Sequence, residues 1–322
     1  MIDITIQNFE AELIGASMQQ PVLLDIWAPW CGPCKSLGPV LEKLETAYEG
    51  RFMLAKLNSD EQPEIAGQLS QAFGVRSIPF CVLFSQGQPV DGFVGALPEA
   101  EIRKFLDKHV PSVDALEADA EVAEAEQLLA EGGDVDTALA KLQEAVAIDP
   151  SNDSARIDYL KLLLSEAVAD PARTTQARQA FEPVASKVLS DTRYAAIEHW
   201  LKACEAVPTA RPMAALEAAI SANRRDFDAR FERAQWLFAH GETTAAMDEL
   251  LEILMRDKTW NQELARKTYV AILELMTKPA AKADPAAGAA KGTLELTGKA
   301  AAAPAADPVL DQYRRKLSMA LF

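Results

Sequence analysis

Hydrophobic positions follow two different periods along this chain of 322 residues, and the change comes near residue 110. Before it, short apolar runs alternate with segments whose apolar residues recur every three or four positions. The runs predict strands over 22–28, 51–60 and, as a hairpin turning at Gln86-Gly87, 78–95. The helical spacing predicts helices over 33–50, 63–75 and 98–110. Strands that alternate with helices indicate an α/β domain with a central sheet over residues 1–110.

Residues 111–276 carry only the helical period, and glycine becomes rare. Two pairs of segments resemble each other: "GDVDTALAKLQEAVAIDP" (133–150) with "GETTAAMDELLEILMRDK" (241–258), and "DSARIDYLKLL" (153–163) with "DFDARFERAQWLF" (226–238). Their offsets, 108 and about 74, agree with repeats of 36 or 37 residues. This period is typical of tetratricopeptide-like helix pairs, marked in the first repeat by Gly133, Ala138, Leu142, Ala145 and Pro150. We expect about four such pairs, forming an all-α solenoid that binds polypeptides or, alternatively, acts as a spacer.

The last 46 residues divide into two parts. Residues 277–306 are low in complexity, dominated by alanine, proline, lysine and glycine, which predicts a linker. Residues 307–322 predict an amphipathic helix, with Asp307 as N-cap and Pro308 as its first residue. Its apolar face carries Leu310, Tyr313, Leu317 and Leu321. Such a helix either docks on the solenoid as a cap or inserts into a groove of a partner.

Charge and composition limit the classes of function. Apolar residues make up 49% of the chain, enough for packed cores, and the net charge of −16 argues against nucleic acid as a partner. Residues 277–322 are net positive while the rest is acidic, so the tail could instead meet an acidic partner. We find no apolar run long enough to span a membrane and no signal peptide, and therefore expect a cytoplasmic protein.

Four cysteines are present, and one pair is closely spaced: Cys31 and Cys34, in "WCGPCK". In a reducing compartment this spacing indicates catalysis or metal binding. A metal is not expected, because a second CxxC is absent and the three histidines are scattered. The other two cysteines, Cys81 and Cys204, are predicted as small buried residues, with an auxiliary thiol near the site as the alternative for Cys81.

Cys31 would lie between a strand and a helix, where the positive end of the helix dipole stabilises a thiolate. In such motifs the thiol pKa falls from about 8.5 to about 7. Cys31 is therefore predicted as the attacking thiolate, and Cys34, one turn inside the helix, as the thiol that resolves the mixed disulfide. We expect no cofactor besides this redox-active disulfide.

The segment "DIWAPWCGPCKSLGPVLEKL" resembles the thioredoxin active site, and the resemblance continues for about 110 residues. It implies that Asp25 is a buried carboxylate assisting proton transfer at Cys34, with Lys56 as its neighbour across the strands. It also implies a cis bond between Ile78 and Pro79. The residues that the resemblance implies would frame the site or contact substrate are Trp27, Trp30, Gly32, Pro33, Ile78, Pro79 and Gly95.

A thioredoxin-like domain followed by tetratricopeptide-like helices and a terminal "YRRKL" helix resembles the bacterial chaperedoxins (CnoX/YbbN). That family implies a cytosolic holdase that binds unfolding proteins, protects their cysteines by thiol–disulfide exchange and passes them to a GroEL-type chaperonin. Its expected partners include DnaK-type chaperones and a thioredoxin or glutathione reducing system. The chaperonin contact would use Leu310, Tyr313, Arg314, Arg315, Leu317 and Leu321.

Two alternatives stay open. One is a general thioredoxin-like reductase whose helical region only docks it to a partner. The other is a holdase whose CxxC has lost its activity, which the presence of Asp25, Lys56, Trp30 and Pro79 disfavours.

Overall fold

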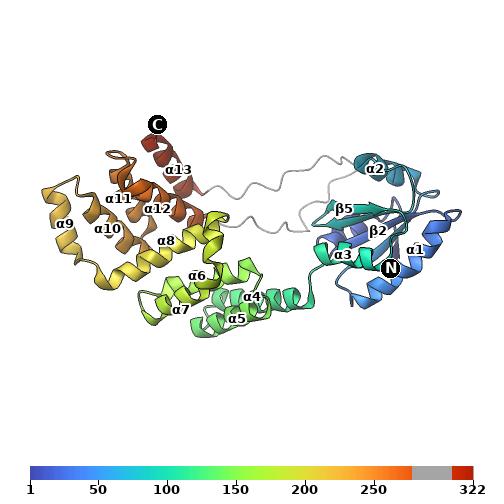
Figure 1. The fold of residues 1–322 in the computed structure, drawn as a ribbon, viewed down its shortest axis with the longest axis horizontal. Helices are drawn as coiled ribbons and strands as arrows, with labels where there is room; N and C mark the ends of the chain where they lie inside the picture. Colours follow the sequence, from blue (N-terminus) through green and yellow to red (C-terminus); the bar gives the residue numbers. More distant parts are fainter. Residues whose placement is uncertain (278–306, 322) are drawn as a thin grey trace. The chain divides into compact units, whose positions relative to one another are not determined.

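A computed structural model describes residues 1–277 and 307–321. The chain divides into two compact units, the first comprising Met1–Leu116 and the second beginning at Glu117 and including the C-terminal helix (Figure 1). Each unit is described by itself. Apart from Thr277, the predicted linker lies outside the described residues.

Unit 1 contains a five-stranded mixed sheet in the order β1-β3-β2-β4-β5 (Figure 1). The strands are β1 (Ile2–Asp3), β2 (Val22–Trp27), β3 (Met53–Asn58), β4 (Phe80–Ser85) and β5 (Gln88–Val94). β3 runs parallel to β1 and β2, while β4 is antiparallel to β2 and β5. The predicted hairpin is present, and both of its turn residues, Gln86 and Gly87, have positive φ.

Every residue of β2 but the last is buried, because helices cover both faces of this sheet. They are η1 (Phe9–Gly15, π-helical), α1 (Gly32–Ala47), α2 (Pro63–Phe73) and α3 (Glu99–His109). Leu24 and Ile26 point to the face covered by η1 and α2, whereas Leu23 packs with α1 and α3 on the other face. This alternation follows from the period of two along a strand. The predicted α/β thioredoxin fold is confirmed.

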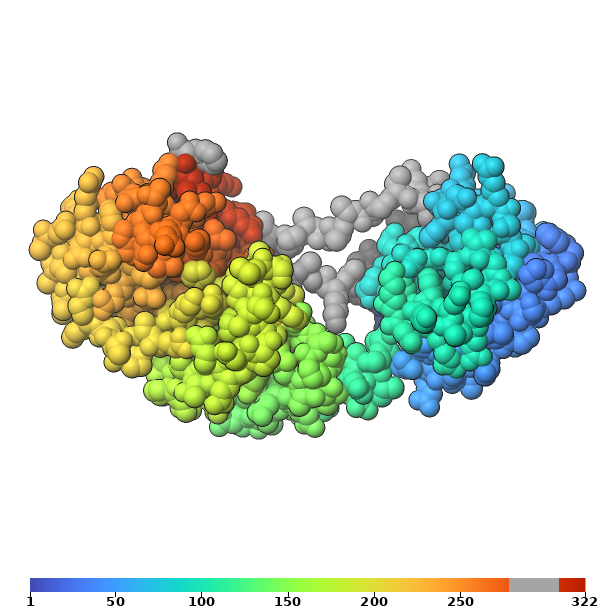
Figure 2. Space-filling view, viewed as in Figure 1, coloured from blue at the N-terminus to red at the C-terminus, as the bar shows by residue number. Residues whose placement is uncertain are grey.

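Unit 2 is all-α, as predicted. Its first helix is α4 (Val113–Ala130), which contains the boundary between the two units. The helices that follow are α5 (Val135–Ile148), α6 (Asp153–Glu166), α7 (Ala172–Phe181), η2 (Glu182–Leu189, 3-10), α8 (Thr192–Ala206), η3 (Val207–Thr209, 3-10), α9 (Met213–Ala222), α10 (Phe227–Ala239), α11 (Thr243–Leu254) and α12 (Trp260–Met276). One large hydrophobic cluster runs through most of these helices and α13 (Pro308–Leu321), whereas α9 packs Leu216 and Ile220 against Ala229 of α10 in a separate small cluster. In the space-filling view they form a continuous body coloured green to red (Figure 2).

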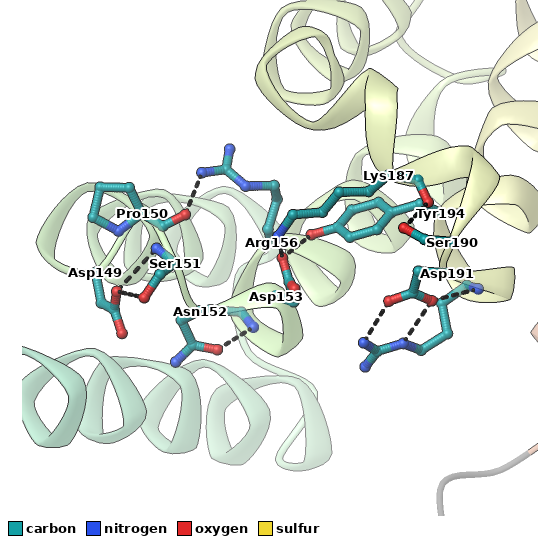
Figure 3. Close-up of polar contacts among 12 residues, drawn as sticks. Asp149, Pro150, Ser151, Asn152, Asp153, Arg156, Lys187, Ser190, Asp191 and Tyr194 are labelled. Carbon is teal, nitrogen blue, oxygen red and sulfur yellow. Dashed lines mark hydrogen bonds and ion pairs between the residues drawn. The ribbon is translucent and has the colours of Figure 1, made fainter. Parts of the chain in front are cut away.

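The internal repeat is visible in the turns that precede α6 and α10. Asn152 caps α6 by accepting from the N–H of Ala155, and Asp226 caps α10 by accepting from that of Ala229. One residue further, Arg156 and Arg230 are both buried and donate to the carbonyl six residues earlier, of Pro150 and Arg224. Figure 3 shows the first of these turns, with Arg156 and Pro150. The positions differ by 74 in each case, so the repeat inferred from the sequence corresponds to repeated geometry.

A polar contact joins the start of α6 to η2 and α8. Oδ1 of Asp153 accepts from Nζ of Lys187 at 2.5 Å and from the hydroxyl of the fully buried Tyr194 at 2.7 Å (Figure 3). The second bond satisfies the Tyr194 hydroxyl inside the cluster, where an unpaired donor would be costly, and the first pairs the Asp153 carboxylate with a positive charge. Asp191, nearby in the same view, caps α8 through the N–H of Arg193.

The C-terminal helix α13 packs on α11 and α12. Asp307 caps it, as predicted, by accepting from the N–H groups of Val309 and Leu310. Tyr313 is buried, donates to Asp248 at 3.1 Å, and its carbonyl accepts from Tyr269 at 2.9 Å. Of the two arrangements considered for this helix, the structure has the docked one.

Candidate functional site

Cys31 and Cys34 form a disulfide at the junction of β2 and α1. Cys31 is the N-cap of α1, and its sulfur accepts from the N–H of Cys34 at 3.2 Å. The unpaired N–H groups of this helix end favour a negative charge on Cys31 once the disulfide is reduced. Both residues are only 4% exposed, so burial in the disulfide form does not distinguish the attacking from the resolving cysteine.

The peptide bond between Ile78 and Pro79 is cis and lies at the start of β4. Ile78 and Trp27 pack against the two cysteines, so the structure brings this bond next to the disulfide. The carbonyl of Pro79 accepts from the N–H of Gly95 at 2.8 Å. Gly95 has φ +88°, while a Cβ there would meet no neighbour within 4 Å, so the backbone conformation is what calls for glycine.

Three exposed residues surround the pair. Trp30 is 70% exposed, and its indole N–H donates to the Asp60 carboxylate at 3.1 Å. Gly32 and Pro33, the two residues between the cysteines, are also exposed. A large apolar surface beside a disulfide is suited to contact with a polypeptide substrate. Asp60 gave no signal in the sequence, because its partner is 30 residues away.

A row of polar side chains crosses three strands on the face covered by α1. Asp25 in β2 lies between Lys56 of β3 and Cys81 of β4, each in direct register. Asp25 is 2% exposed, and this burial raises the pKa of its carboxyl to about 6, although the positive charge of Lys56 acts in the opposite direction. Lys56 itself pairs with Glu42 of α1 at 2.6 Å. A buried carboxyl that titrates near neutrality can accept or release a proton at physiological pH.

The two remaining cysteines are free thiols, and both are buried. Burial raises the pKa of Cys204 to about 12, which makes it an unreactive packing residue in α8, as predicted. Cys81 is fully buried as well, but its sulfur lies 3.8 Å from Oδ1 of Asp25. Sequence reasoning gave Cys81 only the roles of packing residue or auxiliary thiol. It missed this contact, which depends on the pairing of β2 with β4.

Unit 2 contains an apolar groove of about 790 Å³. Its apolar lining comes from α4, α5, α6, α8, α10, α12 and the segment between α6 and α7, and includes Leu129, Leu142, Leu162, Val168, Trp200, Phe238 and Leu275. Two acidic residues, Glu126 and Asp158, and the base Lys161 also line it. Burial raises the pKa of Asp158, with Lys161 opposing. Volume and lining are those of a site for apolar side chains.

The predicted partner-binding residues of α13 are divided by the docking of the helix. Leu310 and Tyr313 are buried, and Leu317 packs against the same cluster. Arg314 and Arg315 are exposed. In this arrangement a partner could contact the two arginines, whereas the apolar side chains become available only if α13 leaves α11 and α12.

The described residues offer neither a metal-binding cluster nor a membrane-spanning helix. Among residues 1–277 and 307–321, no group of three His, Cys, Asp or Glu side chains is placed to hold a metal ion. Within the same described ranges, none of the helices is long and apolar enough to cross a membrane.

Comparison with known proteins also separates an N-terminal α/β part of the chain from a helical part that follows it. The family described as Thioredoxin matches residues 1–108, and that described as Tetratricopeptide repeat matches residues 207–295. The chain is 48% identical to "Thioredoxin" of Chlorobaculum thiosulfatiphilum over 106 residues, which are 33% of this chain and 93% of that protein. It is 49% identical to "Thioredoxin 2" of Chlorobaculum tepidum (33% and 92%) and 41% identical to "Thioredoxin" of Haemophilus influenzae (32% and 91%).

Proposed function

The chain belongs to the thioredoxin family through its first 108 residues, and we propose that it is a redox-active chaperone that reduces the disulfides of polypeptides held by its helical unit. The observation that carries the redox part is the Cys31–Cys34 disulfide at the N-terminus of α1, packed against the cis Ile78–Pro79 bond. The reaction class is thiol–disulfide exchange, and the helical unit confers the binding of protein substrates.

The exchange proceeds in two displacements. The Cys31 thiolate attacks one sulfur of the substrate disulfide, forms a mixed disulfide and releases the other substrate sulfur as a thiolate. Cys34, deprotonated with Asp25 as the proton acceptor, then attacks the sulfur of Cys31. The substrate leaves as a dithiol, two electrons have passed to it, and the Cys31–Cys34 disulfide is restored. A reducing system of the thioredoxin or glutathione type must reduce this disulfide again.

Substrate residues around the reacting disulfide bind to the exposed groups at the site. The backbone beside Pro79 and the exposed Trp30, Gly32 and Pro33 provide the contact surface. An extended substrate chain can pair with backbone groups beside the cis-proline, which orients the substrate sulfur toward Cys31. Lys56 stabilises the ionised form of Asp25 and so keeps it available as a base.

The groove in unit 2 supports the chaperone part of the proposal. Its lining accepts apolar side chains of an unfolding client, and Glu126 and Asp158 favour clients with basic residues beside them. Because clients are held on the same chain as Cys31, the effective concentration of their cysteines near the redox site rises. We further propose a cytoplasmic location and delivery of clients to a GroEL-type chaperonin through the exposed Arg314 and Arg315 of α13.

Light scattering of a thermally unfolding client enzyme tests the chaperone part. Wild type and the Cys31→Ser, Cys34→Ser double variant should both suppress aggregation, because the groove contains neither cysteine. Leu129→Glu, which places a charge in the groove, should abolish suppression. Leu189→Glu is the matched control, since Leu189 is 95% exposed and lies outside the groove. If Leu129→Glu and Leu189→Glu behave alike, the groove does not hold clients.

A second candidate is a general disulfide reductase whose helical unit only docks it to a partner. The exposed Trp30 and the intact disulfide fit this function equally well. It would be favoured if wild type reduces a small disulfide-bonded protein but leaves client aggregation unchanged. Loss of reduction in Cys31→Ser, with aggregation still suppressed by the same variant, favours the redox-active chaperone.

A further inference from the structure

The contact between Cys81 and Asp25 joins two side chains that are almost completely inaccessible to solvent. Cys81 is 0% and Asp25 2% exposed, and they occupy paired positions of neighbouring antiparallel strands. The Cys81 sulfur lies 3.8 Å from Oδ1 of Asp25, within hydrogen-bond range for sulfur. Because burial and the neighbouring carboxyl raise the pKa of the Cys81 thiol, the sulfur keeps its proton and is the donor.

The other charged groups around Asp25 do not satisfy its carboxylate directly. Lys56 approaches from β3, yet its ammonium group forms its ion pair with Glu42 of α1. Within the described residues of unit 1, the Cys81 thiol is the one side-chain donor at hydrogen-bond distance from Asp25. A buried carboxylate with one donor depends strongly on that donor for both its orientation and its charge.

We propose that Cys81 is a positioning residue for the thiol–disulfide exchange: its S–H group holds Oδ1 of Asp25 so that the carboxylate accepts the proton of Cys34. The proposal rests on the proposed redox function. It assigns to Cys81 neither a covalent nor a redox step, because the thiol is inaccessible and remains protonated throughout. The hydrogen bond acts on the second displacement, in which Cys34 must lose its proton.

The direction in which Cys81 shifts the pKa of Asp25 follows from the form of the carboxyl group, ionised or protonated, that accepts the hydrogen bond. A donor stabilises the ionised carboxylate and therefore lowers its pKa relative to the same buried site without a donor. Removing the donor should raise the pKa of Asp25 above its value in the wild type, and a stronger donor should lower it. Sulfur is a weak donor and a hydroxyl a stronger one, so oxygen at this position should enhance the effect.

Valine and threonine at position 81 make the test, because they have the same shape and differ in one hydroxyl group. The carboxyl of Asp25 is titrated by NMR of carbon-13-labelled, full-length protein in the reduced state. Cys81→Val should raise the Asp25 pKa by at least about 0.5 pH unit, and Cys81→Thr should leave it at or below the wild-type value. If the larger side chains prevent folding, the smaller pair Cys81→Ala and Cys81→Ser replaces them. Cys204→Ala is a control that should not move the titration.

A second readout follows the release of substrate from the mixed disulfide as a function of pH. Its midpoint should shift with the Asp25 pKa, upward in Cys81→Val and not in Cys81→Thr. If the Asp25 titrations are equal in the valine and threonine variants, or if the titration shifts while the release midpoint does not, the proposed role of Cys81 is overturned. Either outcome leaves the proposed redox function standing. A wild-type protein that reduces no disulfide would overturn the proposed function, and with it this proposal.

Discussion

Replacing Asp25 by asparagine should change how the stability of unit 1 depends on pH. The carboxyl is buried, and its pKa is raised from 3.8 to about 6 in the folded protein. In the unfolded chain it titrates near its ordinary value. Ionisation therefore costs the folded state more than the unfolded state.

The size of this cost follows from linkage between protonation and folding. The raised pKa differs from 3.8 by about two units, and each unit corresponds to about 1.4 kcal/mol, which gives about 3 kcal/mol. The stability contributed by protonated Asp25 is fully present below about pH 4, is lost as the pH rises toward 6, and stays lost above it. Asparagine has no charge to lose, so the difference between the two proteins should grow by about 3 kcal/mol between pH 4 and pH 8.

Amide hydrogen exchange of β2, followed by mass spectrometry, measures the free energy of unfolding of unit 1 within the full chain. The disulfide form is used, since Cys31 and Cys34 then do not titrate. The amide group of asparagine does not titrate, so its own effect on the free energy of unfolding is equal at pH 4 and pH 8 and cancels in the comparison of the two. If the difference between Asp25→Asn and wild type stays within about 1 kcal/mol from pH 4 to pH 8, burial does not set the ionisation of Asp25.

Three further changes have definite expected outcomes. Asp91 accepts hydrogen bonds from Lys108 and His109, which lower the pKa of its carboxyl to about 2. Asp91→Asn should therefore destabilise unit 1 above about pH 4 by about 1 kcal/mol after solvent screening. In the same exchange measurement this loss of stability should vanish as the pH falls toward 2. Tyr194→Phe removes a hydrogen bond to the charged Asp153 and should lower the free energy of unfolding of unit 2, measured in urea, by about 1.5 kcal/mol. A change near zero would mean that Lys187 is sufficient as the partner of Asp153. Tyr313→Ala should weaken the docking of α13 by about 3 kcal/mol and accelerate amide exchange over 308–321, and unchanged protection there would show that Tyr313 does not hold the helix.

The four longer strands and the position of the cysteine pair follow from the sequence because they depend on short-range patterns, whereas the two-residue strand β1 was not predicted. The apolar run before Cys31 is short, as expected for a buried strand, and Gly32-Pro33 begins a helix well. The same holds for the cap of α13 by Asp307. Local chemistry of this kind needs no knowledge of the rest of the fold.

The surroundings of Asp25 could not be predicted from local patterns. The partner of Lys56 is Glu42, on a helix that crosses the sheet, and the contact of Cys81 depends on the register of β4 against β2. The docking of α13 was left open for a related reason. Its apolar face suits an intramolecular and an intermolecular surface equally, and the choice depends on the exposed face that α11 and α12 offer.

The two turns with a buried arginine have a consequence for how this helical unit can vary. In each turn an Asx cap and an arginine bonded to a backbone carbonyl fix the conformation, so the side chains of the two residues that precede the cap are free to differ. The first turn contains Pro150-Ser151 and the second Arg224-Arg225, one without charge and the other doubly basic. Divergence in surface charge from repeat to repeat is therefore compatible with an unchanged scaffold, and such repeats can drift apart in sequence while the backbone stays the same.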